Sequence, residues 1–135
     1  MKHKQLFILG FTFSFLLGGD HSVFSDIRLD EALVTAKLEG KPVMLKFHAV
    51  WCHFCNKMDN VTFIDENVKN TLEEFISLKL DVDKTDGLSA AHYYKVIALP
   101  TIIILNSKGE KVYHQQGYHS PEQMQKVLKK INAQL

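Results

Sequence analysis

The amino-acid sequence predicts one α/β domain in which a mixed central sheet is flanked by helices. Three observations lead to this fold class. The 135 residues suffice for one ordinary domain and are too few for two, and 46% of them are apolar. Helical and strand-like patterns alternate from residue 26 onward. The chain has only 2 cysteines, which cannot form a network of bridges, so the fold must depend on its hydrophobic core.

Residues 1–25 differ from the rest and predict a secretory signal peptide. A basic start precedes the apolar run 6–17, which falls short of the roughly 20 residues that span a bilayer as a helix. Val23 and Ser25 supply suitable −3 and −1 residues for a signal peptidase, so we expect cleavage after Ser25. An uncleaved N-terminal anchor is the alternative. The mature domain is then expected to comprise residues 26–135 and to be periplasmic or otherwise secreted.

The mature region begins with a helix and a buried strand. Apolar residues recur at helical spacing across residues 26–40, and Gly40 followed by Pro42 ends this helix. The run 43–47 is short and mostly apolar, as expected of a strand in the middle of a sheet. A second helix is expected to open at the cysteine pair, because residues 52–60 contain neither glycine nor proline.

A helix, a strand and a further helix come next. Residues 65–74 predict a helix or turn with inward-facing apolar residues, and residues 75–82 alternate as a strand. The segment 86–95 predicts a helix with Asp86 as a candidate cap.

A hairpin and a last helix complete the domain. Residues 101–105 form an apolar, β-branched strand, the turn 106–109 follows, and residues 110–115 return as an edge strand. Ser120 is expected to cap the last helix, because a proline follows it and a glutamine lies three residues on.

The cysteine pair carries the predicted chemistry. Cys52 stands at the start of a helix, where unpaired N–H groups and the positive end of the helix dipole favour a thiolate. The spacing brings both sulfurs onto one helical turn, close enough for a disulfide, so the second thiol can resolve a mixed disulfide made by the first. We assign Cys52 as the nucleophile and Cys55 as the resolving thiol. No organic cofactor is implied, because the dithiol is itself the redox group.

Other uses of the pair are weighed against this one. The spacing also supplies half of a zinc site, but His48 and His53 lie too close to the pair in sequence to complete a tetrahedron easily. A c-type haem needs a histidine after the second cysteine, where the chain has Asn56. A purely structural disulfide would close too small a loop to stabilise the fold appreciably.

The motif Trp51-Cys52-x-x-Cys55 after a buried strand, joined to Leu99-Pro100-Thr101, resembles the thioredoxin superfamily. The chain looks most like the C-terminal thioredoxin-like domain of the DsbD-type transmembrane reductases and their small secreted relatives, through the further segments 40–45, 57–58 and 62–63. The resemblance implies a thioredoxin fold and thiol–disulfide oxidoreductase activity. It also implies a cis bond between Leu99 and Pro100, in a loop that lies against the disulfide and pairs with substrate.

The neighbours of the pair also have expected roles, of which the resemblance implies that of Trp51. Trp51 is expected to pack beside it and shape the substrate face, with simple core filling as the alternative. Phe54 is expected to give an apolar contact surface. His53 either donates to the Cys52 thiolate or is a solvated residue that only modulates the reduction potential.

One position departs from that family, which usually carries a buried acid six residues before the first cysteine. This chain has Lys46 there, and a buried ammonium favours thiolate and accepts no proton. Asp59 coincides with a second acidic position of the reductase domain. Helical geometry places it one turn beyond Cys55, within range of that thiol. The alternative for Asp59 is an exposed helix carboxylate.

The expected function is therefore thiol–disulfide exchange in the cell envelope, with protein or peptide thiols and disulfides as partners. Resemblance to the reductase domain favours a reductant role, and a membrane thiol reductase is a candidate electron donor. Alternatives are a disulfide oxidant or isomerase, an envelope module that binds copper or zinc, and a redox-inactive peptide-binding domain. Sixteen basic residues against fifteen acidic ones give no large field of one sign, so we expect no nucleic-acid binding. We also expect a monomer.

Overall fold

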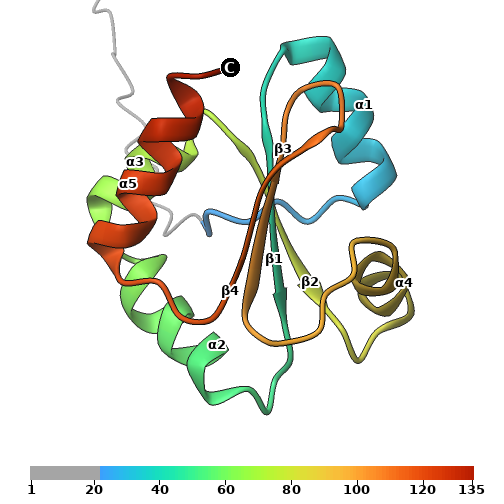
Figure 1. Ribbon diagram of the computed structural model, residues 1–135, viewed down its shortest axis with the longest axis vertical. Coiled ribbons are helices and arrows are strands. Elements are labelled where there is room, and N and C mark those ends of the chain that lie inside the picture. The colour runs from blue at the N-terminus through green and yellow to red at the C-terminus, as the bar shows by residue number, and fades with distance from the viewer. Residues whose placement is uncertain (1–21) are drawn as a thin grey trace, which may run out of the picture.

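The computed structural model describes residues 22–135 (Figure 1). Most of the predicted signal peptide, residues 1–21, lies outside the described residues. In chain order the elements are α1 (Leu29–Glu39), β1 (Val43–His48), α2 (His53–Lys57), the π-helical turn η1 (Met58–Thr62), α3 (Glu66–Leu72), β2 (Ile76–Asp81), α4 (Thr85–Tyr93), β3 (Thr101–Leu105), β4 (Lys111–Gln116) and α5 (Pro121–Asn132). Within the described part of the chain, no helix is long and apolar enough to cross a membrane.

The strands form one mixed sheet in the order β2-β1-β3-β4, which confirms the predicted fold class. β1 pairs parallel with β2 and antiparallel with β3, and β3 pairs antiparallel with β4. The two central strands are those with the most continuous apolar runs. Every residue of β3 is buried, and in β1 only His48 is partly exposed.

Helices cover both faces of the sheet, α1 and α4 on one and α2, α3 and α5 on the other (Figure 1). Alternation along β1 divides the core accordingly. Val43, Leu45 and Phe47 pack on the α1 and α4 side, whereas Met44 belongs to the core beneath α3 and α5. Lys46 lies two residues after Met44 on β1, so both side chains point to the same face of the sheet. The Lys46 side chain therefore enters the core beneath α3 and α5, which we call the second half of the core.

The last helix is capped as predicted. The hydroxyl of Ser120 accepts a hydrogen bond from the Gln123 N–H, and the Gln123 side chain accepts one from the Ser120 N–H. Pro121 is the first helical residue. The buried residues Met124 and Leu128 then place the apolar stripe of α5 in the second half of the core.

The chain before α1 differs from the prediction of a helix over residues 26–40. α1 begins only at Leu29, because the preceding backbone is extended and has no side-chain cap. The Ser25 N–H instead donates to the carbonyl of Ser77 on β2 over 2.8 Å. The Phe24 ring meets that of Phe63 edge-on, with 4.9 Å between ring centroids. Residues 23–25 therefore contact the sheet and the second half of the core.

Two helix predictions need correction. Asp86 is not the cap of α4: the helix starts at Thr85, so Asp86 lies in its first turn. Gly87 in the same turn packs closely on the end of β2, since a Cβ there would lie 1.9 Å from the Asp81 carbonyl oxygen. The α-helix expected across residues 52–60 ends at Lys57, and the chain continues as the π-helical turn η1. Such wide turns are frequent at functional sites.

Candidate active site

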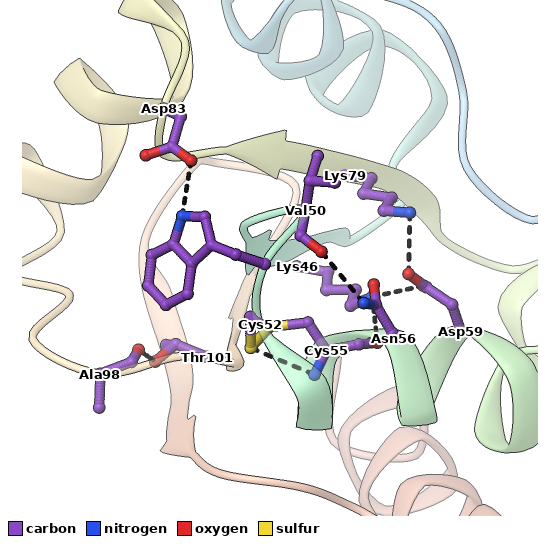
Figure 2. Close-up of a disulfide and its surroundings, with 11 residues drawn as sticks. Lys46, Val50, Cys52, Cys55, Asn56, Asp59, Lys79, Asp83, Ala98 and Thr101 are labelled. Carbon is purple, nitrogen blue, oxygen red and sulfur yellow. Dashed lines mark hydrogen bonds and ion pairs between the residues drawn. A yellow bond between two sulfur atoms is a disulfide. The ribbon is translucent and has the colours of Figure 1, made fainter.

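The cysteine pair lies where β1 delivers the chain to α2. Cys52 is the N-cap residue of this helix, and its sulfur accepts a hydrogen bond from the Cys55 N–H over 3.2 Å. The two residues form a disulfide, with their Cα atoms 5.2 Å apart (Figure 2). The sulfur of Cys52 thus occupies the place of a capping oxygen, where backbone N–H groups stabilise negative charge.

The two cysteines differ in access to solvent. Cys52 is 7% exposed and Cys55 is 0% exposed. Ala49 and Leu99 pack against the pair and cover its inner side. This order of exposure is what an outer attacking thiol and an inner resolving thiol require. The assignment of the two roles stays a prediction.

The loop before β3 adjoins the disulfide. The peptide bond between Leu99 and Pro100 is cis. The Pro100 carbonyl accepts a hydrogen bond from the Gly117 N–H over 2.8 Å, and the Thr101 hydroxyl donates to the Ala98 carbonyl over 2.7 Å. The first bond ties the loop to the chain just after β4, the second closes the loop on itself, and Leu99 packs against the cysteines.

Trp51 lies on the surface beside the pair. Its side chain is among the exposed large apolar groups, at 71%, so core filling does not account for it. Its indole Nε1–H donates to the Asp83 carboxylate over 2.8 Å (Figure 2). Sequence reasoning missed Asp83. The available signal was the parallel pairing of β1 and β2, which brings the loops after both strands to one edge of the sheet.

His53 and Phe54 form the first turn of α2. Both side chains are exposed, and their rings meet edge-on with 5.5 Å between centroids. Phe54 at 54% exposure and Val50 at 72% add apolar surface near Trp51. Trp51, His53 and Phe54 therefore form an exposed surface next to the cysteine pair.

Lys46 and Asp59 meet beneath the pair. The Lys46 ammonium donates to the Asp59 carboxylate and, over 3.2 Å, to the carbonyl of Cys55 (Figure 2). The other carboxylate oxygen of Asp59 lies 2.8 Å from the Lys79 ammonium. Sequence reasoning singled out Lys46 and Asp59 separately but missed Lys79 and the contact that joins all three.

Burial and pairing set the charge of this cluster. Burial lowers the pKa of Lys46 to about 8, against the opposing pull of Asp59. Burial tends to raise the pKa of Asp59, but hydrogen bonds from Lys46 and Lys79 outweigh it and lower that pKa overall. The Asp59 side chain is 21% exposed, so it is not the solvated helix carboxylate offered as its alternative. A carboxylate with a lowered pKa is a weak proton acceptor.

Metal binding is the alternative role for the two cysteines. Across residues 22–135, no cluster of three or more His, Cys, Asp or Glu side chains could hold a metal ion. With the disulfide closed, the sulfurs of Cys52 and Cys55 are bonded to each other.

Comparison with protein families matches residues 29–132 to the model of a thioredoxin-like domain. The chain is 40% identical over 86 residues to the thiol:disulfide interchange protein DsbD of Vibrio cholerae, an alignment that covers 62% of this chain and 14% of that protein. It is 35% identical over 97 residues to the Escherichia coli DsbD, covering 67% and 17% respectively. The chain thus spans less than a fifth of the length of these relatives.

Solved structures agree with this family. A thioredoxin from Thermus thermophilus superposes with a TM-score of 0.72 and 28% identity, covering 79% of this chain and 85% of that one. A putative disulphide-isomerase from Bacteroides thetaiotaomicron gives 0.68 and 32%, covering 82% and 93%. The C-terminal domain of Neisseria meningitidis DsbD, at 23% identity, shares the fold with a TM-score of 0.63, covering 76% and 92%.

Proposed function

Because this chain belongs to the thioredoxin-like domain family and is a thiol:disulfide oxidoreductase, we propose that Cys52 and Cys55 are its redox pair and that it reduces protein disulfides outside the cytoplasm. One observation carries the proposal. A dithiol that closes to a disulfide lies at a helix start, with its outer sulfur beside an apolar surface and a cis-proline loop.

The first step is attack by the outer thiol. In the reduced protein the Cys52 thiolate, stabilised by the N–H of Cys55, attacks one sulfur of a client disulfide. A bond forms between Cys52 and that sulfur, and the client S–S bond breaks. The other client sulfur leaves as a thiolate with the bonding electron pair and takes a proton from solvent. The exposed side chains of Trp51 and Phe54 and the loop at Pro100 are proposed to hold the client segment.

The second step is resolution by the inner thiol. Cys55 loses its proton, and its thiolate attacks the Cys52 sulfur and closes the disulfide between them. The second client sulfur leaves as a thiolate and is protonated by solvent. The protein dithiol has then given two electrons to the client, and solvent has supplied the two protons that the client thiolates take up. A dithiol donor, for which a membrane thiol reductase is our candidate, must reduce Cys52 and Cys55 again.

Different observations support the proposed direction of electron transfer and the proposed location of the protein. The reductant role is supported by likeness to proteins named thiol:disulfide interchange protein DsbD, although the chain spans only 14 and 17% of the two described above. The envelope location is supported by the signal-peptide pattern of residues 1–25, with processing after Ser25.

Two measurements test the proposal. The reduction potential of the Cys52–Cys55 pair, equilibrated with glutathione, should be more negative than that of the glutathione couple. In envelope extracts, Cys55→Ser should accumulate mixed disulfides with client proteins, because attack continues while resolution is lost. Cys52→Ser is the matched control and should trap none. A potential in the range of strong oxidants would reverse the direction, and equal trapping by both variants would disprove the mechanism.

A further inference from the structure

A charged side chain occupies the middle of the sheet directly beneath the redox pair. Lys46 is fully buried on the central strand β1, whose neighbouring residues are apolar. A buried ammonium costs free energy unless hydrogen bonds and opposite charge compensate it. An apolar residue of similar size often gives the folded protein the same stability as such a buried charge, or a higher one. Stability alone therefore gives no reason for a lysine here.

The ammonium contacts the backbone of the resolving cysteine. It donates to the carbonyl oxygen of Cys55 over 3.2 Å and to the Asp59 carboxylate. The centroid of the Phe63 ring lies 5.3 Å from Nζ. These contacts hold the charge away from solvent, where its field on nearby groups is weakly screened.

The surrounding charges do not cancel it. Asp59 on η1 is shared between Lys46 and Lys79 on β2, so two ammonium groups face one carboxylate and the cluster carries a net positive charge. His48, the other titratable group of β1 that interacts with this cluster, has its pKa lowered by burial and by both lysines, which favours its neutral form. Cys55 therefore lies, through its carbonyl, beside a cluster of net positive charge.

We propose that the Lys46 ammonium, held in place by Asp59, favours the thiolate of Cys55 in the reduced protein and so promotes the resolving step. A positive charge beside a thiol lowers the pKa of that thiol. The Cys55 proton then passes to solvent and the sulfur attacks Cys52, with no carboxylate required as the base. Lys46 acts through its field on the reacting sulfur and is a positioning residue. The inference rests on the proposed function, whose second step it explains.

The direct test is the pKa of the Cys55 thiol, measured by NMR of ¹³C-labelled cysteine in Cys52→Ala, where it is the only thiol. Adding Lys46→Gln keeps a hydrogen-bond donor near the Cys55 carbonyl and removes the charge. We expect the Cys55 pKa to rise by about one unit, equivalent to roughly tenfold less thiolate at neutral pH. Lys79→Gln is the matched control. It removes a charge from the same cluster without touching Cys55, and should change that pKa much less.

A kinetic measurement accompanies it. With both cysteines present, Lys46→Gln should release a bound client thiol from the mixed disulfide about tenfold more slowly at pH 7, with the deficit shrinking as the pH rises. Lys46→Met, which fills the same space, serves if the glutamine variant does not fold. An unchanged Cys55 pKa in a folded Lys46 variant, or equal shifts in the Lys46 and Lys79 variants, would overturn the proposal. The pKa of the Cys55 thiol is measured without a client. This measurement therefore tests the role of Lys46 independently of whether the protein reduces envelope disulfides.

Discussion

The indole Nε1–H of Trp51 donates a hydrogen bond to the Asp83 carboxylate across 2.8 Å. This bond joins the residue before Cys52 to the loop after β2, which lies 32 positions further along the chain. Because the indole is 71% exposed, the bond orients a large apolar surface beside the redox pair while leaving it free to meet a partner.

Asp83→Ala should weaken client recognition. Loss of one hydrogen bond, worth about 1 kcal/mol, frees the Trp51 ring and should raise the KM for a disulfide-bonded protein severalfold with little change in kcat. The chain has one tryptophan, so its fluorescence emission reports the change directly. Asp83→Asn keeps an acceptor and is the control. Reduction of a small-molecule disulfide should be unaffected, and an equal loss there would contradict a role in protein recognition.

The two thiols should differ in reactivity. Cys52 is expected to have a pKa below the free value of about 8.5, because it caps α2 and accepts the Cys55 N–H. Cys55 is fully buried, so a reagent reaches it slowly even where its thiolate is favoured. Timed alkylation of the reduced protein at pH 7, followed by peptide mass spectrometry, should label Cys52 first. Similar labelling rates would reverse or abolish the assigned roles.

His119 should make the fold sensitive to mild acid. Its Nδ1 lies 3.1 Å from the Gly117 carbonyl and its Nε2 lies 2.9 Å from the Tyr113 hydroxyl, so the neutral ring donates to the first and accepts from the second. Burial lowers its pKa below the ordinary 6.5. The unfolded chain then binds a proton at higher pH than the folded chain does.

The free energy of unfolding should therefore be highest above pH 6.5 and should fall as the pH drops from 6.5 through the lower pKa of the folded protein. Urea unfolding at several pH values measures this dependence. His48 and His114 also have lowered pKa values from burial, so the informative quantity is the difference from His119→Gln. Parallel curves for both proteins would show that His119 does not contribute.

The position of signal processing should affect stability. Cleavage after Ser25 removes the Phe24 ring from its contact with Phe63 and the N–H that bonds to Ser77. We expect a chain beginning at Asp26 to be less stable than one beginning at Ser22 by about 1–2 kcal/mol, from lost apolar burial and one ring pair. Thermal unfolding measures it. Phe24→Ala in the longer chain should lose most of the difference, whereas equal midpoints for all three would rule out a stabilising contact.

Local pattern was enough for much of this protein. Ser120, Pro121 and Gln123 predict the start of α5 because a cap is formed within a few residues. The apolar runs predict the two central strands because burial on both faces demands them. The cysteine spacing predicts a redox pair for the same local reason, since one helical turn places both sulfurs together.

The contacts around the pair were decided only by tertiary structure. Lys46 lies opposite Lys79 in the register of two parallel strands, and the wide turn η1 presents Asp59 to both. Trp51 donates its hydrogen bond to Asp83 because the parallel strands β1 and β2 end at the same edge of the sheet. Such contacts depend on strand order and register, which long-range packing selects, so no pattern within a few residues of Lys46 could reveal which groups compensate its charge.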